Sequence, residues 1–437
     1  MQFHAPFIVC LLCAAVSSLC VTSVALGATA LDLRAAVARA LDKSPSLAIQ
    51  RAQIALERNR SESAAAALYP SVQLDSTLTA GVGDGHEQQS LRHTSGVALV
   101  APLFDGGKKS AQRHASEHLV TVSELELASK QEDLIYSLVE DYTRIGLLDA
   151  LAQLRAESLK VLTTQRNTLE RSYRQGLRLK SDFLSSDLNV KLAQKKLDEV
   201  MFLRLQKVVE AKEKLGLAAT DDVTLVIPEH PRVSAATATE AVLGQEEILE
   251  YKLLDKRRVQ EKLDVAGAKL ARRPDLNAKI FAGARNELVG SRFFEDRLNT
   301  RAAEASVAIE YPLWDWGTRN REVMNALIQE AQADLRLEEG LLRLRRVVAL
   351  LAAERRQLRS SWILAQDIRQ QAEESFTAYE QNYRIGRVSY ADLALAHEKL
   401  VAAREALMTS EVDLYLNLQK ELMLKGQLGE RVLSNSP

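Results

Sequence analysis

The chain contains the same sequence unit twice, and this duplication constrains its fold more than any other feature. Three pairs of landmarks recur 210 residues apart: PLFDGG and PLWDWG (Pro102–Gly107 and Pro312–Gly317), YRQG and YRIG (Tyr173–Gly176 and Tyr383–Gly386), and Gly216 and Gly426. The offset is constant, so the two spans match without an insertion. Because a repeat of this kind marks a structural unit that occurs more than once, we predict two copies of one fold.

Two long stretches of the chain lack proline and are predicted to be helical almost throughout. No proline lies between Pro102 and Pro228, and none lies between Pro312 and the C-terminal residue. Apolar residues recur every seven positions in the first stretch: Leu138, Ile145, Ala152 and Leu159. This heptad spacing predicts coiled-coil packing against partner helices. A helix from Gly107 to about Tyr173 would span ~100 Å, and the returning helix would span ~60 Å.

Four segments alternate apolar and polar residues, which predicts β-strands. They are residues 72–82, 95–101, 276–284 and 303–311. A period of two gives each strand one apolar and one polar face. The same pattern suits a transmembrane barrel, with the apolar face toward lipid and the polar face toward a lumen. Hairpin tips are predicted at residues 81–89 and 286–300.

A corner from strand to long helix is predicted once in each copy. The six corner residues are Pro102, Asp105, Gly107, Pro312, Asp315 and Gly317. Each proline ends a strand, where a missing N–H does little harm. Each aspartate is predicted to be the N-cap of the long helix, where its carboxylate accepts hydrogen bonds from unpaired amides.

The domain boundaries follow from this unit. The predicted segments are a signal peptide at 1–30, a first repeat at 31–217, a linker at 218–237, a second repeat at 238–428 and a C-terminal tail at 429–437. The signal segment carries no charge between Phe7 and Ala28 and offers cleavage after Gly27 or Ala30. A transmembrane anchor is the alternative for this segment. All three cysteines lie within it, so an exported mature chain would hold no disulfide.

Charge and motif content argue against several function classes. The 57 Lys and Arg residues nearly balance the 58 Asp and Glu residues, without the basic face that nucleic-acid binding requires. His397–Glu398 is not part of an HExxH motif, and no Ser/His/Asp or Cys/His arrangement can be argued. We therefore expect no enzymatic activity, no cofactor and no bound metal.

Four amphipathic strands in one chain cannot close a barrel. An open sheet edge in lipid leaves backbone groups unpaired, at a cost of several kcal/mol each. Closed outer-membrane barrels need about eight strands or more. Three chains would supply twelve strands, so a homotrimer is the simplest closure, and an eight-stranded dimer is the lesser option.

The ordered duplication of corners, YRxG turns and long helices resembles the TolC-like outer-membrane efflux protein family (outer membrane factors). The resemblance covers essentially the whole chain beyond the signal. It implies a mainly α-helical fold with a β-barrel part, in which three chains form a twelve-stranded barrel above a coiled-coil tunnel through the periplasm. It also implies a periplasmic adaptor (membrane fusion protein) and an inner-membrane pump as partners, with outer-membrane lipid around the barrel.

In that family the YRxG turns lie at the periplasmic tip. The resemblance assigns six residues to adaptor docking: Tyr173, Arg174, Gly176, Tyr383, Arg384 and Gly386. On the residues alone, the two glycines suit the left-handed conformation that ends a helix. We therefore expect the other four side chains to be exposed for docking.

The resemblance also assigns a pore and gate. The four residues are Asp182, Tyr383, Arg387 and Asp392. Asp392 would form a threefold ring that selects cations or holds the entrance closed, and Tyr383 with Arg387 would bond across to Asp182. The alternative is that both aspartates are first-turn residues favoured by the helix dipole. Val388 and Leu395 depart from the family pattern, which leaves the details of the gate open.

The sequence therefore predicts an outer-membrane exit duct for a tripartite efflux pump or a type I secretion system. The duct would extend into the periplasm and pass small molecules or proteins outward. A soluble periplasmic coiled-coil adaptor or scaffold is the alternative. The cargo, whether drug, metal or protein, and the class of pump are left open.

Overall fold

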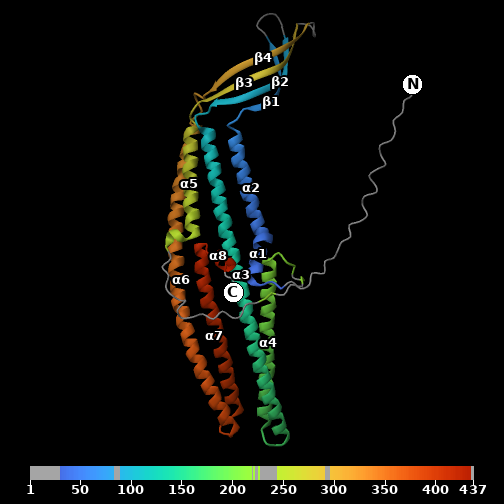
Figure 1. The fold of residues 1–437 in the computed structure, drawn as a ribbon, viewed down its shortest axis with the longest axis vertical. Coiled ribbons are helices and arrows are strands. Elements are labelled where there is room, and N and C mark those ends of the chain that lie inside the picture. Colours follow the sequence, from blue (N-terminus) through green and yellow to red (C-terminus); the bar gives the residue numbers. More distant parts are fainter. Residues whose placement is uncertain are drawn as a thin grey trace, which may run out of the picture.

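The computed structural model describes residues 30–82, 89–218, 220–221, 225–226, 244–290 and 296–434. The predicted signal peptide, apart from Ala30, and most of the predicted linker lie outside these described residues. The molecule is elongated, with a sheet at one end and helices extending away from it (Figure 1). Each half contains the predicted succession of helix, hairpin, long helix, turn and helix.

The two repeats have matching elements. The first contains α2 (Pro45–Ala66), β1 (Ser71–Val82), β2 (Gln89–Phe104), α3 (Lys108–Arg174) and α4 (Lys180–Lys214). The second contains α5 (Leu249–Leu270), β3 (Asp275–Gly290), β4 (Asp296–Glu310), α6 (Thr318–Arg384) and α7 (Tyr390–Lys425). The sequence did not predict α1 (Leu33–Lys43), α8 (Leu428–Ser434) or the short η2 (Gln245–Glu247). Within the described part of the chain, no helix combines the length and apolar character needed to cross a membrane.

The helices α3 and α6 are the longest elements, with 67 residues each. Each is paired along its length with two shorter helices, α2 then α4 beside α3, and α5 then α7 beside α6 (Figure 1). The partner of α3 changes where α4 ends, beside Lys43 of α1 and just before α2 begins. The partner of α6 changes where α7 ends, beside Leu249, the first residue of α5. The two breaks fall at the same level of the molecule, close to α1 and α8 (Figure 1).

The predicted heptad stripe of α3 is only partly correct. Leu138 and Ile145 are fully buried, whereas Ala152 and Leu159 are half-buried. Leu154 is buried instead in that region. The buried face moves around the helix because α3 packs against different helices along its length.

One antiparallel sheet joins the two repeats in the order β1-β2-β3-β4. The central contact, between β2 and β3, pairs a strand of one repeat with a strand of the other. An apolar face crosses all four strands and is exposed, as predicted: Val72, Leu74, Val97, Leu99, Ile280, Val307 and Ile309. The opposite face carries the ion pairs Lys279–Asp75 and Arg285–Glu304.

Two glycines let the repeats approach closely at the centre of the sheet. Gly96 and Gly283 are direct partners in the register of β2 and β3. A Cβ on Gly96 would lie 2.6 Å from the Gly283 Cα and 2.7 Å from the ring of Phe281. The buried Phe281 ring therefore takes the space that side chains would otherwise fill at this pair.

The strands are longer than the sequence predicts. Residues 286–290 and 296–300 continue β3 and β4, although they were assigned to a hairpin tip. These extensions contain Asn286, Gly290 and Asp296, residue types that are common in turns and depleted in strands, which explains the error. The predicted tip at 81–89 lies mostly outside the described residues.

The corners use the predicted residues in slightly different positions. β2 runs past Pro102 to Phe104 with an irregular register, and β4 ends before Pro312. The N-cap positions are Gly107 and Gly317, so the aspartates were placed wrongly at the caps. Each aspartate nevertheless accepts backbone hydrogen bonds from two residues and four residues farther along the chain, at 2.7–3.1 Å.

Candidate functional site

The two helical tips have the same turn geometry. The N–H of Gly176 donates to the Tyr173 carbonyl, and the N–H of Leu177 donates to the Ser172 carbonyl. Gly386 and Arg387 make the equivalent bonds at the second tip. This is a Schellman motif, which needs a left-handed residue, and the two glycines have φ of 72° and 77°.

Replacing Gly386 with valine should destabilise this turn by roughly 1 kcal/mol or more, whereas asparagine should be tolerated. A Cβ at this position meets nothing within 4 Å, so the cost is conformational and not steric. Thermal unfolding followed by helical circular dichroism measures the difference between the two variants. If both variants lost the same stability, side-chain contacts, and not the positive φ, would explain why glycine is needed at this position.

The tyrosines among the predicted docking residues are less exposed than expected. Tyr173 stacks on Phe183 with ring centroids 5.8 Å apart, and Tyr383 lies edge-on to Tyr390 at 6.4 Å. Both tyrosines are half-buried because these rings close their own hairpins. Arg174 and Arg384 are exposed, and each pairs with a glutamate one turn earlier in its own helix.

The two tips contact each other through Arg178. Its guanidinium lies 5.4 Å from the centre of the Tyr383 ring, a cation–π contact between the α3–α4 turn and the last turn of α6. Burial raises the pKa of the Tyr383 hydroxyl, while the charge of Arg178 lowers it and that of Asp182 raises it. The charge of Asp182 acts on Tyr383, but no hydrogen bond joins the two side chains among the described residues.

Arg387, the arginine assigned to the gate, has no side-chain partner within the described residues of the single chain. Arg387 is exposed, and its side chain makes no hydrogen bond or ion pair within the described ranges. Arg178 takes the place over Tyr383 instead. It stands two residues after Gly176, and the same position after Gly386 is Val388, so a comparison of the repeats could have identified it.

The two predicted pore aspartates differ in local role. Asp392 forms a capping box with Ser389: its carboxylate accepts from the Ser389 N–H at 3.2 Å and from the Ser389 hydroxyl at 2.6 Å. The side-chain and backbone hydrogen bonds from Ser389 lower the pKa of Asp392. Asp182 has no such cap, because Leu179 occupies the equivalent N-cap position. Within one chain, capping at the start of α7 therefore accounts for the position of the Asp392 side chain.

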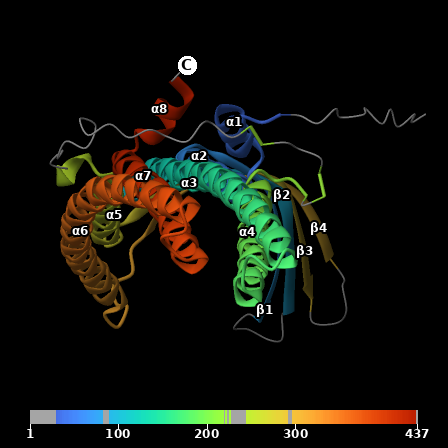
Figure 2. The ribbon, with the colours of Figure 1, turned by 90° about the horizontal axis from the view of Figure 1, so that it is seen from below.

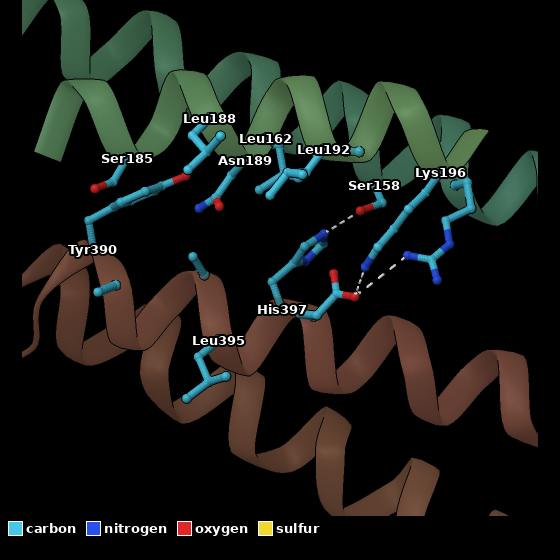
Figure 3. Close-up of a pocket in the computed structure, with 15 residues that line it drawn as sticks. Ser158, Leu162, Ser185, Leu188, Asn189, Leu192, Lys196, Tyr390, Leu395 and His397 are labelled. Carbon is cyan, nitrogen blue, oxygen red and sulfur yellow. Dashed lines mark hydrogen bonds and ion pairs between the residues drawn. The ribbon is translucent and has the colours of Figure 1, made fainter. Parts of the chain in front are cut away.

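The two helical hairpins meet above the tips. Seen from below, the lower helices form a curved row in the order α6, α7, α3, α4 (Figure 2). A cavity of about 450 Å³ lies between α3, α4 and α7 (Figure 3). Leucines line much of it, and the buried side chains of Tyr390 and His397 border it from α7. His397 presents a buried polar atom, Nδ1, without a hydrogen-bond partner among the described residues.

Polar contacts beside this cavity join the hairpins. His397 Nε2 lies 2.8 Å from Ser158 Oγ of α3. The neighbouring Glu398 pairs with Lys196 of α4 and lies 3.8 Å from Arg155 of α3 (Figure 3). These contacts link residues more than 200 positions apart, and sequence periodicity gave no signal for them. The described residues contain no group of three potential metal ligands.

Known proteins share this architecture. A family model described as outer membrane efflux protein matches residues 36–215 and 253–422. Outer membrane protein VceC from Vibrio cholerae is 19% identical, with 89% of this chain and 95% of that chain covered and a TM-score of 0.75. The CmeC outer membrane channel of Campylobacter jejuni is 13% identical, with coverage of 91% and 86% and a TM-score of 0.75.

The MtrE outer membrane channel of Neisseria gonorrhoeae, solved in its open state, is also similar. It is 15% identical, with 91% of this chain and 88% of that chain covered and a TM-score of 0.70. No curated protein sequence matches the chain significantly. At these identities, the structural likeness establishes the fold, and the family model extends over both repeats.

Proposed function

Because the chain belongs to the outer membrane efflux protein family, we propose that it is the exit duct of a tripartite efflux pump or a type I secretion system. The protein resides in the outer membrane and extends into the periplasm. A soluble periplasmic adaptor is not favoured, since the family match covers both repeats. The similar solved structures are themselves outer membrane proteins and channels.

The observation that carries the proposal is the open sheet. β1 and β4 are its two edges, and the exposed apolar face runs across all four strands. In lipid, these edges would leave N–H and C=O groups without partners. Pairing β4 of one chain with β1 of the next removes every edge, and three chains give a twelve-stranded barrel.

Aromatic residues at the base of the sheet support this placement. Exposed aromatic side chains gather at the junctions between sheet and helices: Tyr69, Phe104, Tyr311, Trp314 and Trp316. Aromatic rings concentrate where a membrane meets water, because they present both an apolar body and a polar edge. The repeated PL-aromatic-D corner therefore suits the periplasmic boundary of the bilayer.

The tips suit an adaptor-facing entrance. Arg174 and Arg384 are exposed there, together with Leu177 and Ile385. We propose that these tips meet a periplasmic adaptor, which connects the duct to an inner-membrane pump. In the trimer, the three Asp392 carboxylates would lie near the axis at the narrow end and select cations.

Planar bilayer recordings of the purified protein test this proposal. We expect discrete, cation-selective channels from a trimer, and weaker selectivity in the Asp392→Asn variant. Asparagine can still accept the hydrogen bond from the Ser389 N–H, so the helix start is retained while the charge is lost. Absence of channels from a correctly assembled oligomer would contradict the duct, whereas unchanged selectivity would restrict Asp392 to its capping role.

A further inference from the structure

His397 occupies the place where the two helical hairpins meet. It lies on α7, is only 7% exposed, and contacts Ser158 of α3 through Nε2. Its ring also packs against the Phe376 ring of α6, with centroids 5.4 Å apart. The adjacent Glu398 reaches Lys196 of α4. This short segment of α7 therefore contacts the other three helices of the lower half.

We propose that His397 is a pH-sensitive latch between the two hairpins, closed while its imidazole is neutral and released when the imidazole is protonated. In the closed state Nδ1 is buried and has no hydrogen-bond partner among the described residues. Protonation would place a hydrogen on both ring nitrogens and leave the N–H at Nδ1 buried without an acceptor. Separation of α7 from α3 would give that N–H access to water.

The charges around the latch come from all four helices. They are Arg155 and Glu157 on α3, Lys196 on α4, Glu373 and Glu380 on α6, and Glu398 and Arg404 on α7. Burial acts to raise the pKa of Glu398. The hydrogen bond from Lys196, together with the positive charges of Lys196 and Arg155, outweighs burial, so this pKa is lowered overall. Arg404 donates to Glu373, whose pKa is also lowered despite burial. Histidine is the side chain that normally changes charge between about pH 5 and 8.

The direction of the effect follows from the environment of His397. Burial lowers its pKa, and the charges of Arg404 and Arg155 lower it further, while Glu398 acts in the opposite direction. An exposed histidine titrates near about pH 6.5. The open form therefore binds the proton more readily, so the latch is intact above about pH 6.5 and weakens as the pH falls below it. The ratio of closed to open chains should fall by up to about tenfold per pH unit until the lowered pKa is reached.

Spin-label distances between the tips test the latch. The three native cysteines all lie at or before Cys20, so Gln175→Cys and Gln381→Cys in a mature chain give one label on each hairpin. With labelled chains diluted among unlabelled ones in the trimer, the wild-type latch should show one short distance near pH 8 and a growing longer population toward about pH 5. His397→Gln keeps a hydrogen-bonding side chain without a titrating group, and its distances should not change with pH. Labels at Gln175→Cys and Lys195→Cys, within one hairpin, provide the control.

The same pH dependence in His397→Gln and wild type would overturn the proposal. Hydrogen–deuterium exchange at the imidazole C2 position of the wild-type protein gives a second test that needs no variant. The titration of His397 and the change in tip distance should share one midpoint, and clearly separate midpoints would also overturn the latch. The latch proposal is argued from the contacts between the two hairpins. Any effect of the latch on transport depends, in addition, on the proposed function. Distances can therefore refute the latch while conductance tests the duct.

Discussion

Removal of the Arg178 guanidinium should raise the open probability of the resting channel by up to about a hundredfold over wild type in planar bilayers. Arg178 is the residue that links the two tips, through its contact with the Tyr383 ring. A cation–π contact of this kind contributes roughly 1 kcal/mol. Three copies in a trimer would contribute about 3 kcal/mol, which corresponds to on the order of a hundredfold change in the ratio of closed to open channels. Single-channel recordings of Arg178→Ala measure this change directly.

Two variants show whether the contact itself is responsible. Arg174→Ala removes an arginine from the same tip, but within the described residues Arg174 pairs only with Glu170 of its own helix, so the conductance should not change. Tyr383→Phe keeps the aromatic face and should also conduct like wild type. If Tyr383→Phe opened the channel as much as Arg178→Ala, a hydrogen bond from the hydroxyl to Asp182 would be the lock instead. Unchanged conductance in Arg178→Ala would remove this arginine from the gate.

Replacing Arg355 with alanine should lower the free energy of unfolding by about 3–5 kcal/mol. Arg355 on α6 is 5% exposed and pairs with the buried Glu421 of α7 at 2.6 Å. It also donates to Asn417 of α7 at 3.0 Å. Truncation would leave a buried carboxylate with Lys425 as its remaining ion-pair partner in the described chain. Urea unfolding in detergent, followed by helical circular dichroism, gives the free-energy difference.

A second arginine of α6 provides the matched control for this prediction. Arg343 pairs with Glu250 of α5 at the surface, and both side chains are well exposed. Arg343→Ala should cost less than about 1 kcal/mol, because exposed ion pairs contribute little. Leucine at both Arg355 and Glu421 should recover most of the loss, because no lone charge remains buried. A small effect of Arg355→Ala, similar to that of Arg343→Ala, would mean that water reaches Glu421 in the folded protein.

The features that local sequence determines were predicted well. The first long helix was expected from Gly107 to about Tyr173 and runs from Lys108 to Arg174. Its ends are set by residues within a few positions, namely the Asp105 corner and the Gly176 turn. The duplication then placed the second helix equally well. Strands were recognised from their alternation, but their ends were not, because glycine, asparagine and aspartate near the strand ends look like turn residues.

The candidate site depended on contacts that no periodicity encodes. Arg178 and Tyr383 come from different repeats and meet only because two hairpins lie side by side. Ser158 and His397 are likewise far apart in sequence. Arg355 looks like an ordinary surface residue of a charged helix until its buried partner on α7 is known. Each of these pairs depends on how α3, α6 and α7 pack together. The sequence pattern predicts that long helices pack against one another, but it does not predict which residues face each other.

The change of partners along α3 and α6 has a mechanical consequence. Below the level where α4 and α7 end, each hairpin has helices of about 35 residues, is roughly 50 Å long, and is held at its lower part by side-chain contacts with the other hairpin. If those contacts are released, a tilt of about 5° at the upper end would move the tip by roughly 4–5 Å, given that length. The upper halves, held by α2 and α5, need not deform. Small torques applied at the tips would thus give large displacements there, with little load transmitted to the sheet.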